Sequence, residues 1–405
     1  MSRKFMAFCI LFVGSLVAVP AVLAAQEFVY VESNVQSPNG NTILAFRRNA
    51  DGTLAQIPGS PFPAGGSGVQ DTSLGVGSYE SDQNIWIDST RKLLFAVNSG
   101  SDTIAAFHIH HNGSLQPVEG SPFSSGGTNP VSIGQFGDIL FVVNKNGDPP
   151  RVSNTFPNYT AFRILHDGSL RPVENSTVGV ALGSSPTQAL VVPKAELMFG
   201  ADLFGGLLQS FRIEENGSIH QNPPLPLVTS DFTSAAPPLP DGLWPHPNLP
   251  LLYVGYVAAN RLGVYRWNED GRLSFIRTVP NNGVAICWVR VNRRGTRLYT
   301  SNTVSASGDT STLSTYDITD PENPVEIQTP QLIGQGNARQ ITLSDDEKFL
   351  YAITGRFSTK IPNGQGNALH IFAIQEDGTL SERSPIDIPV PAGTLSQGVA
   401  VYTAR

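Results

Sequence analysis

The sequence FRRNADGTLAQIPGSPF, residues 46–62, returns further along the chain as FHIHHNGSLQPVEGSPF, residues 107–123. Both copies run from an aromatic residue through Asp-Gly or Asn-Gly to the tetrapeptide Gly-Ser-Pro-Phe. Asp-Gly and Asn-Gly supply the positive φ that a tight hairpin turn needs. This turn marker, followed by any residue and then Leu or Ile, recurs with its glycine at Gly52, Gly113, Gly168, Gly217, Gly271 and Gly378. The recurrence predicts a repeat architecture built from β-hairpins.

Two further markers set the number of repeats at seven. The interval between Gly271 and Gly378 is a double step, and Asp320–Asn323 makes the missing turn in another way. One aromatic residue lies in an apolar run before each turn: Tyr30, Phe95, Phe141, Phe199, Tyr253, Tyr299 and Tyr351. A second lies just before each turn: Phe46, Phe107, Phe162, Phe211, Tyr265, Tyr316 and Phe372. Seven units of about 54 residues each are typical of propeller blades.

One unit contains four short strands, as residues 82–119 illustrate with DQNIWID, KLLFAVN, TIAAFHI and LQPVE. A single four-stranded sheet cannot bury both of its faces, whereas seven sheets packed around an axis can. The segment EFVYVES, residues 27–33, matches the second strand of a blade, but no first strand precedes it. The segment SQGVAVY, residues 396–402, matches a first strand and could complete that blade. The sequence therefore predicts an all-β fold, a seven-bladed β-propeller of four-stranded blades over residues 25–405, closed by the C-terminal strand that completes the first blade.

Residues 1–24 have the pattern of a secretory signal peptide. Arg3 and Lys4 precede an apolar run, and small residues end at Ala24. The mature protein is therefore expected to be secreted or periplasmic, and no later stretch is long and apolar enough to span a membrane. Cys9 leaves with this segment, so Cys287 is expected to form no internal disulfide. Acidic residues exceed basic ones and no basic cluster occurs, so nucleic acid is not an expected partner.

The loops before the first strand and after the second strand of each blade are long and variable, and these loops share one face of a propeller. Binding sites usually lie in such loops on a rigid scaffold. Alignment of the repeats places a set of mainly amide and basic residues at this face: Asn84, Gln188, Trp288, Arg339, Gln340, Arg356 and Gln397. A ring of this kind could bind a small polar or anionic ligand in the central channel, or a peptide or protein. The alternative interpretation is that the amides only satisfy the strand ends.

No metal or cofactor is expected. The sequence has no phosphate-binding glycine loop and no Gly-x-Ser-x-Gly nucleophile elbow. His108 and His110 would share a face of a third strand, but they lie beside a structural turn and have no carboxylate cluster near them in sequence. A solvated outer strand is the favoured interpretation for this pair.

The repeated blade sequence resembles that of the lactonase family of seven-bladed propellers. This family includes 6-phosphogluconolactonases and fungal carboxy-muconate cyclases. The resemblance is carried by the Asp/Asn-Gly turns, by Gly-Ser-Pro-Phe after two blades, and by the strand pair LLFAVNSGSDTIAAF, residues 93–107. It covers the whole chain after the predicted signal peptide. It implies opening or closing of a lactone ring.

The resemblance implies His, Arg and Glu as catalytic groups around the channel. In the matching segment, residues 337–357, Arg339 keeps the arginine and is the implied catalytic residue. Gln340 stands where the family has His, and Thr354-Gly355 stand where it has Asn-Glu. In SPTQALVVP, residues 185–193, Gln188 likewise occupies a position where His is common. A glutamine amide does not act as a general acid or base at neutral pH.

Three hypotheses follow. The first is an exported enzyme that hydrolyses or forms a lactone of a sugar acid or muconate-like compound, with Arg339 stabilising negative charge and a base such as Asp148 or Asp202. The second is a non-catalytic binding or protein-interaction propeller outside the cytoplasm. The third is a scaffold without a small-molecule site.

Overall fold

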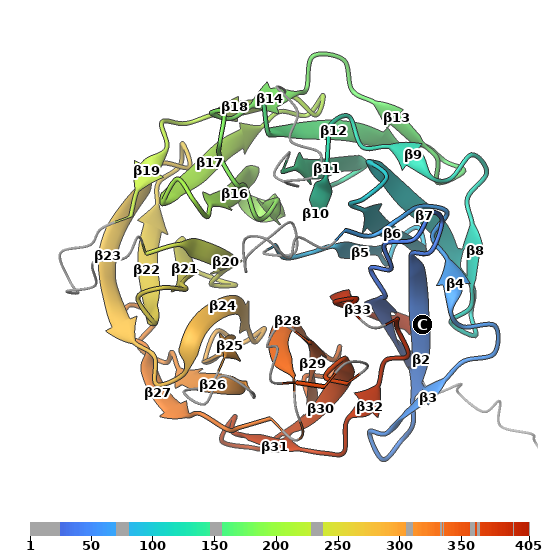
Figure 1. Ribbon diagram of the computed structural model, residues 1–405. Coiled ribbons are helices and arrows are strands. Elements are labelled where there is room, and N and C mark those ends of the chain that lie inside the picture. The colour runs from blue at the N-terminus through green and yellow to red at the C-terminus, as the bar shows by residue number, and fades with distance from the viewer. Residues whose placement is uncertain are drawn as a thin grey trace, which may run out of the picture.

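The computed structural model forms a ring of seven antiparallel sheets around a central axis, as Figure 1 shows. It describes residues 25–69, 81–145, 156–227, 238–304, 311–332, 334, 336–356, 361–362, 365–391 and 393–404. The predicted signal peptide and Asp148 lie outside these ranges. The all-β fold and the seven blades are confirmed, and within the described ranges no helix is long and apolar enough to cross a membrane.

Each blade has a path of four strands that runs from the axis outward. Blade 1 consists of β33 (Gln397–Ala404), β1 (Gln26–Glu32), β2 (Thr42–Arg48) and β3 (Leu54–Gln56). Blade 2 consists of β5 (Ile85–Asp88), β6 (Leu93–Asn98), β7 (Thr103–Ile109) and β8 (Leu115–Pro117). Blade 3 consists of β10 (Pro130–Phe136), β11 (Ile139–Asn144), β12 (Asn158–Ile164) and β13 (Leu170–Pro172). Blade 4 consists of β15 (Leu190–Val192), β16 (Leu197–Asp202), β17 (Leu207–Ile213) and β18 (Ile219–Gln221), with the short 3-10 helix η2 (Pro193–Ala195) between its first two strands.

The remaining three blades repeat the same order. Blade 5 consists of β20 (Pro240–Pro245), β21 (Leu251–Tyr256), β22 (Arg261–Trp267) and β23 (Leu273–Pro280). Blade 6 consists of β24 (Val284–Val291), β25 (Arg297–Val304), β26 (Thr312–Asp317) and β27 (Val325–Gln328). Blade 7 consists of β28 (Asn337–Leu343), β29 (Phe349–Gly355), β30 (Ala368–Ile374) and β31 (Leu380–Glu382). Five blades add a two-residue strand to their third strand: β4 (Phe62–Pro63), β9 (Phe123–Ser124), β14 (Val178–Gly179), β19 (Leu225–Pro226) and β32 (Ile386–Asp387).

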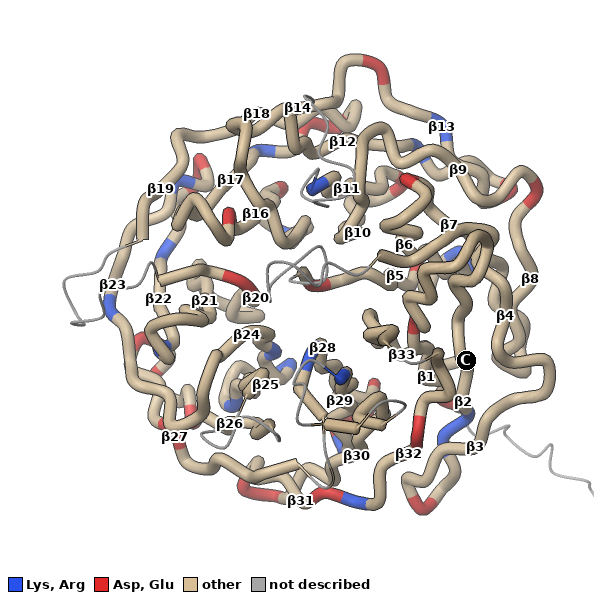
Figure 2. The backbone as a smooth tube through the Cα atoms, viewed as in Figure 1, with Lys and Arg blue, Asp and Glu red and all other residues tan. Residues whose placement is uncertain are grey.

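The two ends of the chain close the ring within blade 1. β33 pairs antiparallel with β1, from Gln26 opposite Ala404 to Glu32 opposite Gln397. The last strand is therefore the innermost strand of the first blade, next to β1, as the labels in Figure 2 show. The closure predicted from the sequence is confirmed.

The turn of the repeated motif packs each blade against the previous one. All six turn glycines have φ between +80° and +91°. A Cβ atom at Gly113 of blade 2 would overlap the ring of Phe28 in blade 1. The Tyr30 hydroxyl of blade 1 donates to the Gly113 carbonyl over 2.9 Å. The turn Asp320–Asn323 has the same role, because the Tyr253 hydroxyl donates to the Pro321 carbonyl over 2.8 Å.

The Gly-Ser-Pro-Phe tetrapeptide repeats its conformation in both copies. Ser60 and Ser121 each precede a cis proline. Their hydroxyls each accept a hydrogen bond from a third-strand amide, Ala45 and Ala106, over 2.9 Å. The serine of the tetrapeptide therefore has a structural role, because its hydroxyl gives a backbone N–H group of the third strand a hydrogen-bond partner.

The core of the described chain lies between the blades rather than along the axis. Seven apolar clusters each join residues of two neighbouring sheets. The aromatic residues marked in the second strands are buried in these clusters or beside them, with exposures of 1% or less. Polar residues of the inner strands are therefore left to face the axis.

Replacing Gly113 with alanine is expected to destabilise the protein by roughly 2–4 kcal/mol, because the residue needs φ = +82° and its Cβ would displace Phe28. Gly137 has φ = +60° and no atom within 4 Å of an added Cβ, so Gly137→Ala should cost only about 1 kcal/mol. Urea unfolding of both variants measures the difference. Equal losses would contradict the packing role of the turn.

Candidate functional site at the propeller axis

A short irregular segment, Ser81–Asn84, leads into β5 and bonds to the inner parts of other blades, and we call it the axial segment. Its main chain bonds to two other blades. The Asp82 amide donates to the Thr187 carbonyl of blade 4 over 3.2 Å, and the Gln83 carbonyl accepts from the Ile133 amide of blade 3 over 2.9 Å. A segment that leads into blade 2 is therefore anchored on blades 3 and 4.

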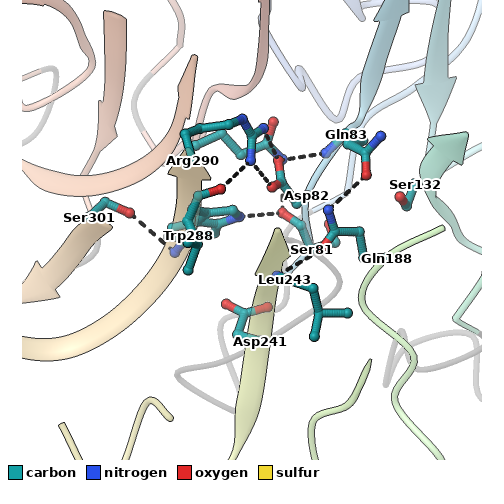
Figure 3. Close-up of polar contacts among 12 residues, drawn as sticks. Ser81, Asp82, Gln83, Ser132, Gln188, Asp241, Leu243, Trp288, Arg290 and Ser301 are labelled. Carbon is teal, nitrogen blue, oxygen red and sulfur yellow. Dashed lines mark hydrogen bonds and ion pairs between the residues drawn. The ribbon is translucent and has the colours of Figure 1, made fainter. Parts of the chain in front are cut away.

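A buried ion pair fixes the axial segment to blade 6, as Figure 3 shows. The Arg290 guanidinium donates to both Asp82 carboxylate oxygens, over 2.5 and 2.8 Å. The side chains are 8% and 1% exposed. Arg290 also lies over the Trp244 ring, 4.1 Å from its centroid. This is bidentate carboxylate recognition in a desolvated setting, the geometry for which arginine is best suited.

Four of the residues predicted from the sequence meet at the axial segment, and one of them, Asn84, belongs to it. Trp288 Nε1 and Gln340 Nε2 both donate to the Ser81 carbonyl, over 2.7 and 2.8 Å. Gln340 also donates to the Asn84 side chain, and Asn84 Nδ2 donates to Gln397 Oε1 over 3.2 Å. The four come from blades 6, 7, 2 and 1, and these hydrogen bonds join them to one another and to the main chain of the axial segment.

Gln188 joins the same cluster from blade 4. Its Nε2 donates to Gln83 Oε1 over 2.7 Å, and its Oε1 accepts from the Leu243 amide over 2.9 Å. Both ends of the amide are therefore engaged, one by the axial segment and one by blade 5. Asp241 of blade 5 is fully buried in this region, and its carbonyl accepts from the Thr187 hydroxyl over 3.0 Å.

The two predicted arginines of blade 7 have separate positions. Arg339 lies on β28 and is 1% exposed. A Cβ added at Gly355 would be 3.3 Å from Arg339 Nε, so glycine at that position leaves room for the guanidinium. Arg356 Nε donates to the Ile361 carbonyl over 2.5 Å, so Arg356 is held by its own loop. Figure 2 shows basic residues beside β24 and β28 on the inner side of the ring.

Two buried carboxyl groups, one on blade 4 and one on blade 1, adjoin the site. Asp202, a predicted base, accepts from the Ser185 and Gly205 amides over 2.8 and 2.9 Å and so caps a loop. Glu32 was missed by the alignment of the repeats. It is 0% exposed, lies opposite Gln397 in the β1–β33 pair and accepts from Asn41 Nδ2 over 2.8 Å. Burial raises the pKa of the Glu32 carboxyl well above its usual range, with the Asn41 bond acting in the opposite direction.

The remaining sequence candidates lie elsewhere or form no cluster. His108 is half-buried on β7, and His110 and His111 are exposed at the turn that follows. Among the residues that the structure describes, no three His, Cys, Asp or Glu side chains group closely enough to hold a metal ion. Cys287 is buried and accepts a hydrogen bond from the Thr303 hydroxyl over 3.0 Å.

A surface pocket of about 450 Å³ opens on the face where the first and second strands of the blades are joined. Its lining comes from blades 1, 2, 6 and 7 and includes Lys92, Arg293, Asp345 and Tyr402. It contains no residue of the axial segment or of the predicted ring. We therefore keep the axial cluster as the candidate site, because the buried Arg290–Asp82 pair lies there beside several hydrogen-bonded amide side chains.

Comparison with solved structures places this architecture among known propellers. A candidate 6-phosphogluconolactonase from Bacteroides uniformis superposes with a TM-score of 0.69 at 15% identity, over 93% of this chain and 99% of that one. The periplasmic gluconolactonase of Pseudomonas aeruginosa gives 0.66 at 15% identity, over 94% and 100%. A protein from Lactobacillus plantarum gives 0.67 at 16% identity, over 94% and 100%. The chain has the fold of the lactonase-type propellers. At the level of fold, the predicted resemblance is confirmed.

No protein-family model matches the chain, and the search of curated proteins returned no match. At identities near 15% the superpositions establish the shape of the lactonase-type fold and leave the chemistry to be argued from the residues.

Proposed function

We propose that this protein is an exported lactonase-type propeller that hydrolyses, or forms, a lactone of a sugar acid or muconate-like compound. The observation that carries the proposal is the end-to-end superposition on propellers that include a periplasmic gluconolactonase. The signal-peptide pattern of residues 1–24 supports a secreted or periplasmic location.

The chemistry would use the polar groups at the axis. Attack of water on a lactone carbonyl develops negative charge on oxygen, and Arg339 would stabilise that charge from its buried position on β28. The amides of Asn84, Gln188 and Gln340 would bind hydroxyl groups of the substrate. Glu32, Asp202 and Asp241 are buried carboxyl groups near this ring, and one of them would accept the proton from water and return it to the ring oxygen as the C–O bond breaks.

Replacing Arg339 with alanine is expected to lower lactone turnover by about 10²-fold or more, on the order of the loss when one oxyanion donor is removed. Acid release at constant pH from gluconolactone, muconolactone and homoserine lactones measures the rate. Arg171→Ala, on the exposed outer strand β13, is the matched control and should keep full activity. Arg339→Lys tests whether a charge at this position is enough, and thermal unfolding checks that each variant is folded.

The second candidate function is a non-catalytic binding propeller. It is favoured by the bonds that Gln188 and Gln340 make to the axial segment, since amides that satisfy their own chain are not poised for a substrate. Folded protein that turns over none of these lactones, yet gains thermal stability with a sugar acid, would support this candidate against the enzyme.

A further inference from the structure

We propose that Arg290 is a carboxylate-binding site at the propeller axis, and that Asp82 is its built-in occupant, which the carboxylate of a small sugar acid displaces. The inference rests on the proposed function only in its choice of a sugar acid as the ligand. It concerns binding and requires no turnover.

The geometry of the pair is that of a receptor and its ligand. Two parallel N–H groups of Arg290 meet the two oxygens of one carboxylate, and Trp244 covers the guanidinium face. Arg290 belongs to β24, where it pairs with Tyr299 of β25 beyond a β-bulge, whereas Asp82 precedes β5 in a segment without strand structure. The rigid partner is therefore the receptor, and the carboxylate is the part that can be exchanged.

The surroundings of Asp82 fit a polyhydroxylated acid. The axial segment makes polar bonds to Trp288, Gln340, Gln188 and main-chain groups of blades 3 and 4. When the segment leaves, these donors and acceptors lose their partners together. A sugar acid brings one carboxylate and several hydroxyls, which are the groups that the vacated partners require.

The internal carboxylate lowers the apparent affinity for any external one. A tethered group competes at an effective concentration in the millimolar range or above. Removing the Asp82 carboxylate should therefore increase affinity for an added carboxylate, because the competent fraction of the site rises.

The test uses the full mature chain with Asp82→Ala and compares sodium gluconate with sodium chloride at equal ionic strength. We expect gluconate to raise the thermal midpoint of Asp82→Ala in a saturable way, with a Kd at least about tenfold below that of the wild type. Gluconate should act more strongly than acetate. Because gluconate is already ring-opened, failure of lactone hydrolysis leaves this result unaffected.

Two variants keep the test decisive. Asp82→Ala/Arg290→Met removes the receptor as well and should show the same midpoint in gluconate and chloride. Asp82→Asn retains the shape of the segment and serves if the alanine variant does not fold. Equal effects of gluconate and chloride on both single variants would overturn the proposal, and so would an undiminished gluconate shift in the double variant.

Discussion

Replacing Arg290 with alanine is expected to lower the free energy of unfolding by about 3–5 kcal/mol, because it leaves the Asp82 carboxylate buried without its partner. The carboxylate is 1% exposed, so water cannot replace the guanidinium without opening the axis. The cost is dominated by this unpaired charge rather than by the bonds that are lost. The stacking of Arg290 on Trp244 contributes a smaller share.

Urea unfolding at neutral pH measures this loss, and two further variants show its origin. Asp82→Ala/Arg290→Ala should recover part of the stability, because no single buried charge is left. Arg266→Ala removes an arginine from an exposed pair with Glu322, in which both side chains are more than 40% exposed, and should cost about 1 kcal/mol or less. If Arg290→Ala lowered the free energy of unfolding no more than Arg266→Ala does, the Arg290–Asp82 pair would have to be solvated.

The fold was predictable because its information is local and repeated. Asn112-Gly113 specifies a hairpin turn within one blade, and the same glycine packs on Phe28 of the previous blade. One phrase therefore encodes both the hairpin and the blade interface. The ring closure could be predicted by counting strands. The first blade has no inner strand before residue 27, and residues 396–402 supply one.

The site was predictable only where it lies on regular strands. Gln340 and Gln397 were found by alignment of the repeats, and the structure places both beside Asn84 at the axis. Asp82 opens the segment DQNIWID, which the repeat pattern predicts as a strand, but β5 begins only at Ile85, so the pattern could not assign the partner of Asp82. Arg290 carried a usable signal, because it is the charged residue in the otherwise apolar strand VAICWVRV, residues 284–291.

Deleting residues 396–405 is expected to abolish cooperative folding, because it removes β33, the inner strand of blade 1. The strand covers Val29, Tyr30 and Val31 of β1, which are 0% exposed in the closed ring. Burial of Val399 and Tyr402 alone is worth about 1.5–3 kcal/mol each, and the unpaired β1 edge adds unsatisfied N–H and C=O groups. The sum approaches the roughly 5–15 kcal/mol by which whole domains are stable.

Circular dichroism during heating measures the loss, and a synthetic peptide of residues 396–405 tests whether β33 acts as a closing strand. Added to the truncated chain, the peptide should restore a cooperative transition, since antiparallel pairing with β1 needs no covalent link. A Val399→Pro peptide should restore it poorly, because proline fixes φ near about −65°, far from the extended φ of the strand that pairs with β1. A truncated chain that unfolds at the wild-type midpoint without any peptide would mean that the other blades close the ring by themselves.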